Sequence, residues 1–288
     1  MSVNIQTLKD IRNYLIKELN DIYPEQELTA ITNLIFKTHF GIGRLHQLTD
    51  SGRIVSPPAV NGFFKICDEL KTGKPIQYVL GETSFYNCTI KVNNETLIPR
   101  PETEELVDVI IRENKGFKGR IIDIGTGSGC IAIAIKKSLQ EAEVIGIEIS
   151  DGALKMAKLN AILNNVDISF LKGDIFQIDP DSIPPSGLII SNPPYVLESE
   201  KQFMNRNVID FEPHSTLFVP DEDPLRFYRA ILKLSASILV AGGKVYFEIN
   251  EKQGGGITRL LESAGYSEVK VLNDINGKNR IIKGTRNG

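Results

Sequence analysis

The sequence has few of the residues that build covalent or metal-based frameworks. Its 288 residues include three cysteines, and these are widely spaced without a Cys-x-x-Cys pair. This spacing argues against both a disulfide framework and a zinc site. The three histidines also lack the spacing of metal ligands. We therefore expect no metal, and we expect Cys67, Cys88 and Cys130 to be reduced packing residues.

An excess of charge of one sign and long apolar stretches are also missing. The chain has 33 Lys and Arg against 36 Asp and Glu, a formal net charge of −3. Such a balance gives no broad attraction to a nucleic-acid backbone or an anionic membrane surface. The first ten residues lack the order of a signal peptide, and no apolar run is long enough to span a bilayer. We expect a cytoplasmic protein with no membrane association and no stable nucleic-acid binding.

The length predicts two domains, because domains usually contain about 100–200 residues. Apolar residues recur at helical spacing through residues 5–73, and Ser56 followed by Pro57 is typical of a helix start. We interpret residues 1–80 as a small helical bundle. Its nine basic and eight acidic residues favour a packing or protein-docking domain over a DNA-reading one.

Residues 81–100 have the composition of strands rather than helices. Residues 83–92 and 96–98 are rich in aromatic and β-branched side chains, and Asn93-Asn94 separates the two stretches. Asparagine pairs are common in turns. The pattern predicts a hairpin, turning at Asn93-Asn94, that links the two domains.

Residues 101–288 alternate between short apolar strands and amphipathic helices. This alternation predicts an α/β fold, with a doubly wound and mostly parallel sheet. The expected strands are residues 120–124, 144–149, 168–171, 188–191, 244–249, 269–272 and 280–283, and the expected helices are residues 130–139, 151–164, 225–239 and 257–264.

A glycine-rich loop follows the first of these strands and opens a helix. It consists of Asp123 and Ile124 followed by Gly125-Thr126-Gly127-Ser128-Gly129. Glycines let the backbone approach a ligand there, and free N–H groups point outward. The third glycine comes one residue too early for the dinucleotide fingerprint, and a carboxylate at Asp123 suits an ammonium group better than a pyrophosphate. The loop resembles that of S-adenosylmethionine-dependent methyltransferases.

Two later strand ends complete a predicted nucleoside pocket. Glu148 ends the second strand, where its carboxylate can accept both hydroxyls of a ribose, although it can also simply cap the next helix. Asp174 and Ile175 follow the third strand, and Ile175 or Phe176 is placed to cover an adenine ring.

Asn192-Pro193-Pro194-Tyr195 at the end of the fourth strand carries the predicted chemistry. A planar amide or base nitrogen is a poor nucleophile because its lone pair is delocalised. The Asn192 side-chain oxygen and the Pro193 carbonyl can each accept one of its N–H groups and aim the nitrogen at a sulfonium methyl. The ring of Tyr195 is expected to pack against the flat group. We predict that Asn192, Pro193 and Tyr195 are catalytic, that Pro194 helps to bind substrate, and that Asn192 also contacts the cofactor.

Together these residues resemble the HemK/PrmC protein-(glutamine) methyltransferases over nearly the whole chain. The likeness extends to further segments: Gln77-Tyr78-Val79-Leu80-Gly81, Leu97-Ile98-Pro99-Arg100-Pro101-Glu102-Thr103-Glu104, Phe211-Glu212-Pro213, Phe247-Glu248-Ile249 and Gln253-Gly254. The chain departs from the family pattern at Glu148, where aspartate is more frequent, at Asp221-Glu222-Asp223 in place of aspartate-glycine, and at Asn250 in place of glycine.

The resemblance implies a class I methyltransferase domain with a seven-stranded Rossmann-like sheet and S-adenosylmethionine as cofactor. The implied substrate is the glutamine of the Gly-Gly-Gln motif in class 1 peptide chain release factors, docked with the help of the N-terminal helices. A nucleic-acid methyltransferase acting on an exocyclic amine is the alternative, because the same four residues can hold an extruded base. A binding module without catalysis is a third.

Two points stay open at this level. Arg100 and Glu102 are candidates for ordering the cofactor or the loop after Tyr195, or for forming a structural ion pair. Residues 196–223 are expected to form one long loop that closes on the substrate.

Overall fold

The computed structural model describes residues 5–288, so Met1–Asn4, part of the stretch considered for a signal peptide, lie outside the described residues. The chain divides into two compact units. The first contains the chain up to Gly81 together with Asn205–Phe211, and the second contains Glu82–Met204 and Glu212–Gly288. No helix of the described residues combines the length and apolar character needed to cross a bilayer.

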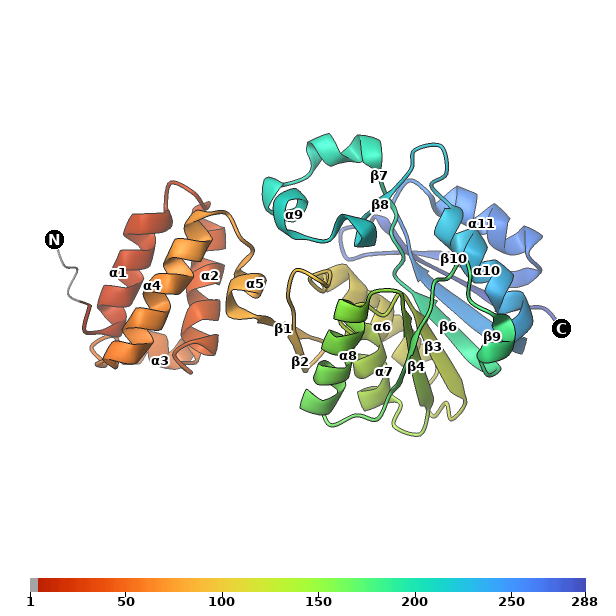
Figure 1. Ribbon diagram of the computed structural model, residues 1–288, viewed down its shortest axis with the longest axis horizontal. Coiled ribbons are helices and arrows are strands. Elements are labelled where there is room, and N and C mark those ends of the chain that lie inside the picture. Colours follow the sequence, from red (N-terminus) through yellow and green to blue (C-terminus); the bar gives the residue numbers. More distant parts are fainter. Residues whose placement is uncertain (1–4) are drawn as a thin grey trace. The chain divides into compact units, whose positions relative to one another are not determined.

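The first unit is a bundle of short helices (Figure 1). Thr7 and Asp10 form a reciprocal capping box at the start of the first helix, and the apolar faces bury a common core that includes Leu15, Ile35 and Phe63. Ser56 is the N-cap residue before Pro57 as expected, but its side chain makes no capping hydrogen bond. The helices are α1 (Leu8–Leu19), α2 (Glu25–Thr38), α3 (Arg44–Thr49), α4 (Pro57–Lys71) and α5 (Ile76–Leu80).

The second unit begins with a hairpin whose turn was predicted at the wrong place. Strands β1 (Glu82–Phe85) and β2 (Cys88–Lys91) pair in antiparallel register. Tyr86 and Asn87 connect them, with φ of 43° and 61°, as a tight hairpin turn with two left-handed residues requires. Asn93 lies beyond the hairpin, where its side-chain oxygen accepts the N–H of Glu95, and residues 96–98 form no strand.

A seven-stranded sheet forms the centre of this unit and confirms the predicted fold class. Its order is β10-β11-β9-β6-β3-β4-β5. The five strands from β9 to β5 are parallel, whereas β11 is antiparallel to both of its neighbours. The strands are β3 (Arg120–Ile124), β4 (Glu143–Glu148), β5 (Ser169–Lys172), β6 (Ser186–Ser191), β9 (Leu239–Glu248), β10 (Tyr266–Asn273) and β11 (Asn279–Arg286).

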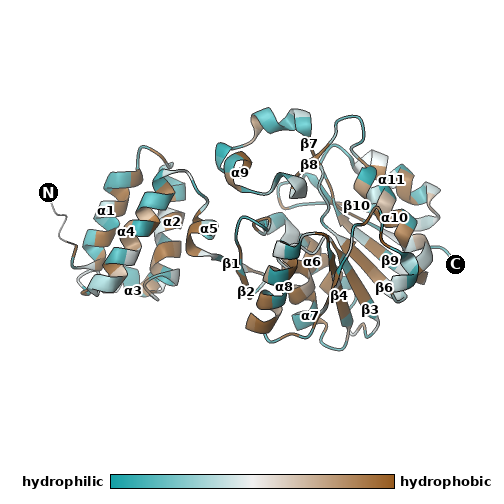
Figure 2. Ribbon diagram, in the orientation of Figure 1, coloured by the Kyte–Doolittle hydropathy of each residue, from teal (hydrophilic) through white to brown (hydrophobic). Residues whose placement is uncertain are grey.

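Helices cover both faces of the sheet, with α6, α7 and α8 on one face and α10 and α11 on the other (Figure 1). The central strands are nearly continuous apolar runs because both faces are buried, and Figure 2 shows them as the most hydrophobic part of the unit. The helices are α6 (Pro101–Glu113), α7 (Cys130–Ser138), α8 (Asp151–Leu163), α10 (Arg226–Ile238) and α11 (Gly254–Ser263).

Helix α6 was not predicted, although the sequence carries its signals. Pro101 occupies the first turn, Glu102 and Glu104 follow it in the acidic first turn, and Leu106 and Ile110 are buried at helical spacing. Proline and acidic residues favour helix N-termini because the first N–H groups are unpaired there and the helix dipole is positive. The family-like segment Leu97–Glu104 overlaps these signals, and it therefore includes a helix start.

Residues 196–223 are not one open loop as expected. The segment starts with β7 (Val196–Leu197), which pairs in parallel with β8 (Phe218–Val219) near its end. Between them lie the 3-10 helices η2 (Glu198–Phe203) and η3 (His214–Thr216), and the short helix α9 (Arg206–Phe211). The β7–β8 pairing fixes the two ends of the segment side by side. Its closure on a substrate stays a prediction.

Candidate active site

A cavity of about 310 Å³ opens at the carboxyl ends of the parallel strands. Ile124, Glu148, Gly173 and Ser191, at or just after the ends of β3, β4, β5 and β6, contribute to its lining. The chain order reverses direction between β3 and β6, and open α/β sheets bind ligands at such a switch point. The volume lies at the lower end of the range of about 300–1,000 Å³ typical of small-molecule sites.

The glycine loop forms one wall of this cavity and has room for a ligand. Gly125 and Gly127 have φ of +72° and +55°, and a Cβ on either would point into open space. Gly129 has a different constraint, because a Cβ there would lie 3.1 Å from the Cβ of Ala157. The first two glycines therefore leave the backbone accessible, and the third allows α7 to begin close to α8. This is the cradle expected for a nucleoside cofactor.

Asn160 supports the loop from α8, and the sequence analysis did not identify it. This asparagine is fully buried. Its side-chain Nδ2 donates to the carbonyls of Ser128 and Lys91, at 2.9 Å each, and its Oδ1 accepts the N–H of Lys91 at 2.7 Å. One side chain thus connects the glycine loop to the edge of strand β2. The only signal of this role in the sequence was a polar asparagine within a predicted helix.

Asp123 contacts the glycine loop from the protein interior. It is fully buried and does not line the cavity. Its Oδ2 accepts the hydroxyl of Thr126 at 2.6 Å, and its Oδ1 has no hydrogen-bond partner among the described residues. Burial raises the pKa of Asp123 to about 7. In this structure Asp123 supports the loop through Thr126, and its contact with the ammonium group of the cofactor stays a prediction.

The raised pKa of Asp123 predicts a pH effect on stability. Its pKa is about 7 in the folded protein against 3.8 ordinarily, so the folded state binds more protons between these values. The stabilisation is complete below pH 4 and is lost as the pH rises through about 7. We expect Asp123→Asn to remove this contribution. The free energy of unfolding of the wild type should then fall more between pH 5 and pH 8 than that of the variant, so the variant is relatively more stable at pH 8. Urea unfolding at both pH values measures it; a difference independent of pH would contradict the assignment.

Glu148 lines the cavity and is held by three backbone groups. Its Oε2 accepts the N–H of Gly127 at 2.9 Å, and its Oε1 accepts those of Ile149 and Ser150 at 2.8 and 3.0 Å. Ser150 is the N-cap residue of α8, so Glu148 is not the helix cap that we considered as an alternative. A carboxylate has about four acceptor positions. At least one therefore stays available for a ribose hydroxyl.

Replacing Glu148 by alanine is expected to weaken S-adenosylmethionine binding by about 1–3 kcal/mol, since charge-assisted hydrogen bonds are lost. Such a loss raises the Kd by roughly 5- to 150-fold. Titration calorimetry of the purified variant measures the effect. Glu143→Ala on the same strand, whose side chain is exposed and pairs with Arg120, is the control and should bind as the wild type does. An unchanged Kd for Glu148→Ala would exclude the ribose role.

The residues after β5 form an aromatic wall of the cavity. Asp174, Ile175 and Phe176 all line it. The Asp174 side chain turns back on its own loop, where Oδ1 accepts the N–H of Phe176 at 2.9 Å. The ring of Phe176 lies 5.1 Å from that of Phe227, and the guanidinium of Arg226 lies 4.7 Å above Phe176. This flat apolar wall fits the face of an adenine ring.

Asn192, Pro193 and Pro194 lie together on the cavity wall. The hydroxyl of Ser191 donates to the carbonyl of Ile124 at 2.7 Å and thereby fastens the end of β6 to that of β3. Asn192 Nδ2 donates to Thr103 Oγ1 at 3.2 Å. Within residues 5–288, neither Asn192 Oδ1 nor the Pro193 carbonyl accepts a hydrogen bond. Two acceptors are therefore available side by side.

The side chain of Tyr195 points into the protein. It is not among the residues that line the cavity, and its ring packs against the buried core. Its hydroxyl donates to Glu248 Oε1 at 2.9 Å. Because the hydroxyl is satisfied inside the protein, the ring is held in the core in this conformation. Its stacking on a substrate group stays a prediction.

Arg100 lines the cavity and has a partner that the sequence did not indicate. Its Nη2 lies 2.6 Å from Oε1 of Glu212, whose side chain is 1% exposed. The second carboxylate oxygen of Glu212 accepts the N–H of Ile98 at 3.3 Å. Glu212 belongs to the family-like segment Phe211-Glu212-Pro213, and Arg100 belongs to the family-like segment Leu97–Glu104. The ion pair therefore connects these two segments. Glu102 does not line the cavity and forms no ion pair in the described part of the chain.

Two of the departures from the family pattern fasten the segment that follows Tyr195. Asp221 accepts the N–H of Ser199 at 3.1 Å. Asn250 donates to Glu200 Oε2 at 3.1 Å and to the carbonyl of Tyr195 at 3.4 Å. Both residues therefore hold η2 and the chain before it, and a glycine at position 250 could not form the two contacts of Asn250.

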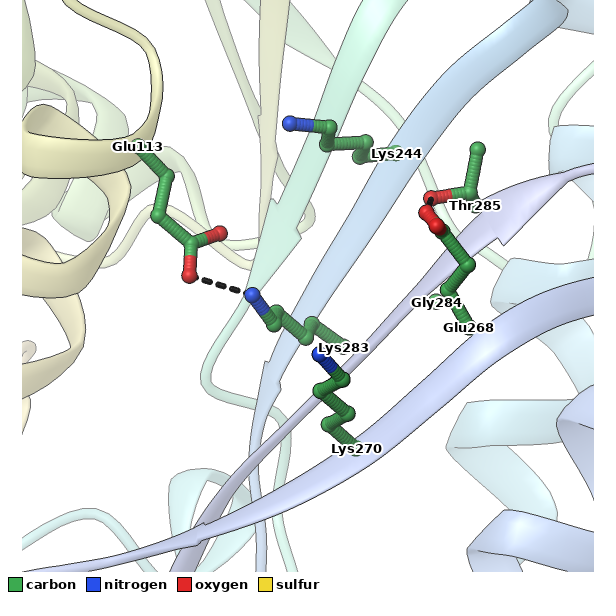
Figure 3. Close-up of a pocket in the computed structure, with 7 residues that line it drawn as sticks. All are labelled: Glu113, Lys244, Glu268, Lys270, Lys283, Gly284 and Thr285. Atoms are coloured by element: carbon green, nitrogen blue, oxygen red, sulfur yellow. Dashed lines mark hydrogen bonds and ion pairs between the residues drawn. The ribbon is translucent and has the colours of Figure 1, made fainter.

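A second hollow, of about 80 Å³, lies beside β9, β10 and β11 (Figure 3). Lys283 forms an ion pair with Glu113 there, and Lys244 and Lys270 also contribute to the lining. This volume is well below that of ordinary ligand sites, so the larger cavity is the candidate active site. No group of three or more metal-ligating side chains is found within residues 5–288.

Comparisons with known proteins identify the family of the chain. Residues 10–81 match the PrmC N-terminal domain, and residues 102–210 match the methyltransferase small domain. The release factor glutamine methyltransferase of Bacteroides thetaiotaomicron is 42% identical over 276 residues, which cover 96% of this chain and 99% of the relative. That of Flavobacterium psychrophilum is 41% identical over 286 residues, with 96% and 98% covered.

Among solved structures, a methyltransferase from Pyrococcus furiosus matches with a TM-score of 0.54 and 18% identity, over 71% of this chain and 92% of that one. This likeness supports the fold. The two full-length relatives go further and confirm the resemblance inferred from the motifs. The chain therefore belongs to the family of release factor glutamine methyltransferases.

Proposed function

We propose that this enzyme methylates the side-chain amide nitrogen of the glutamine in the Gly-Gly-Gln motif of class 1 release factors. The observation that carries the proposal is the pair of free acceptors, Asn192 Oδ1 and the Pro193 carbonyl, on the wall of a nucleoside-sized cavity. Family membership supports the substrate, because the full-length relatives are release factor glutamine methyltransferases.

The two acceptors address the main difficulty of the reaction. A carboxamide nitrogen carries two N–H groups and a delocalised lone pair, so it attacks poorly without help. Hydrogen bonds from both N–H groups to Asn192 Oδ1 and the Pro193 carbonyl fix and polarise the nitrogen. The fixed φ of Pro193 and Pro194 keeps this segment rigid. No dedicated base is needed, because the product nitrogen can lose its extra proton afterward.

The cofactor is S-adenosylmethionine, whose sulfonium makes its methyl group electrophilic. We assign its binding to the loop Gly125–Gly129 with Thr126 and Ser128, to Glu148, and to the wall formed by Asp174, Ile175 and Phe176. Asn192 lines the same cavity, which supports a position of the substrate nitrogen next to the cofactor's reactive end. Positioning and electrostatics then supply most of the catalysis.

We assign release factor docking to the N-terminal helices, because residues 10–81 match the PrmC N-terminal domain. Their nearly balanced charge fits a protein partner. The substrate acts in translation, so we also propose a cytoplasmic location.

The test is mass spectrometry after incubation of the purified protein with S-adenosylmethionine and, in separate reactions, a release factor, DNA and transfer RNA. We expect a gain of one methyl group on the Gly-Gly-Gln peptide and none on either nucleic acid. Methyl transfer to a nucleic acid, with none to the release factor, would show that Asn192 holds a base. No transfer to any of the three would contradict the proposal.

A further inference from the structure

A chain of hydrogen bonds connects Asn192 to a carboxylate inside the protein. Asn192 Nδ2 donates to Thr103 Oγ1 at 3.2 Å, and the Thr103 hydroxyl donates to Glu248 Oε2 at 2.6 Å. Thr103 lies in the first turn of α6, and Glu248 is the last residue of β9. The chain thus connects three separate elements and ends at the residue we assign to the substrate.

The direction of these bonds follows from the chemistry of the buried end. An ionised carboxylate can only accept hydrogen bonds, and a hydroxyl has a single hydrogen to donate. Once the Thr103 hydroxyl donates to Glu248, its oxygen can only accept from Asn192. Asn192 must then turn its NH₂ group toward Thr103, which leaves Oδ1 for the cavity. The reversed carboxamide would present a donor to the N–H groups of the substrate amide, and the contact would be repulsive.

Glu248 is held rigidly enough to impose this direction. Its side chain is buried, with 1% of the residue exposed. Tyr195 donates to the other carboxylate oxygen at 2.9 Å, and Tyr228 donates to the backbone carbonyl of Glu248 at 2.9 Å. Burial raises the pKa of Glu248, whereas the hydrogen bonds from Thr103 and Tyr195 and the charge of Arg280 favour the ionised form. These contacts also explain why Tyr195 points into the protein.

We propose that Thr103 and Glu248 are positioning residues that orient the Asn192 carboxamide, with its oxygen toward the substrate nitrogen. The inference rests on the proposed function of Asn192 as an acceptor for the substrate amide. Thr103 and Glu248 lie in two family-like segments that belong neither to the glycine loop nor to Asn192–Tyr195. Orienting Asn192 gives these two segments a role.

The test compares variants that remove the relay with variants that keep it. Thr103→Val keeps the shape but loses the hydroxyl, and Glu248→Gln adds a donor that lets the relay run in either direction. We expect each to lower kcat by about 10- to 100-fold, because small misplacements of a reacting group have effects of this size. The KM values for S-adenosylmethionine and release factor should change by less than about threefold, since ground-state binding is little affected. Thr103→Ser should recover a kcat within about threefold of the wild type, because it keeps the hydroxyl.

Ser235→Ala is the matched control. Ser235 is a buried hydroxyl residue on α10 that bonds to Tyr266, outside the cavity lining. It should keep the wild-type kcat, and thermal unfolding of all variants shows which effects come from lost stability. Wild-type kcat in both Thr103→Val and Glu248→Gln, or a Thr103→Ser variant as slow as Thr103→Val, would overturn the proposal. Failure of the wild-type enzyme to methylate the release factor would instead contradict the proposed function.

Discussion

Asn192→Ala is expected to lower kcat by about 100- to 1,000-fold, the effect of losing one preorganised polar group at a reacting centre. The side-chain oxygen is one of two acceptors for the substrate N–H groups, and its contribution is largest when the nitrogen begins to carry positive charge. The Kd for S-adenosylmethionine should rise by less than about threefold, because the loop, Glu148 and the aromatic wall keep their contacts. Single-turnover kinetics and titration calorimetry measure the two quantities.

Asn276→Ala provides the control for this experiment. Asn276 is exposed in the turn between β10 and β11, and its side chain makes no hydrogen bond within residues 5–288. Its replacement should change neither kcat nor Kd. A loss of cofactor affinity in Asn192→Ala as large as the loss of kcat would contradict the assignment, since it would make Asn192 a cofactor ligand first.

Arg100→Ala is expected to destabilise the protein by about 3 kcal/mol, because removing one partner leaves a buried charge unpaired. The Arg100 side chain is 32% exposed, but that of Glu212 is only 1% exposed. Glu212 would keep the N–H of Ile98 as a donor and lose its counter-charge. Urea unfolding measures the change. The double variant Arg100→Ala/Glu212→Gln should recover part of the loss, because a neutral amide needs no counter-charge.

Arg112→Ala is the control for this prediction. Arg112 pairs with Asp108 on the surface of α6 and is 73% exposed. Exposed pairs contribute about 0–1 kcal/mol, so this change should be small. A destabilisation by Arg100→Ala no larger than that of Arg112→Ala would show that the buried pair is not structural. In that case a loss of activity in Arg100→Ala would assign the residue to the cavity it lines.

The sequence alone determined the fold class and the main parts of the candidate site. Strands buried on both faces are continuous apolar runs, and helices packed on them show apolar residues at helical spacing, so both could be recognised locally. The loop Gly125–Gly129 and the segment Asn192–Tyr195 could be recognised for a related reason. Each is a short run of neighbouring residues with a single predicted function, and each follows a strand whose end lies at the same edge of the sheet.

Local errors came where several signals competed. The hairpin turn was placed at Asn93-Asn94 because asparagine is common in turns, yet Tyr86 and Asn87 form it with positive φ. Hydrogen bonds from β2 to Asn160 of α8 and to Asn164, the residue that follows this helix, fix that register. A turn propensity does not contain this information. The start of α6 was missed because its residues were considered only as a family-like motif.

The tertiary structure alone decided how the site residues are supported. Arg100 is paired with Glu212 across 112 residues of chain, Thr103 with Asn192 across 89, and Thr103 with Glu248 across 145. It also decided that Asp123 and Tyr195 face the interior, because each finds a hydrogen-bond partner there. A sequence states which groups can donate or accept, but which of them meet depends on how the strands and helices pack. The sequence could therefore indicate candidate residues for the reaction, whereas the contacts between residues far apart in the chain could be known only from the packing.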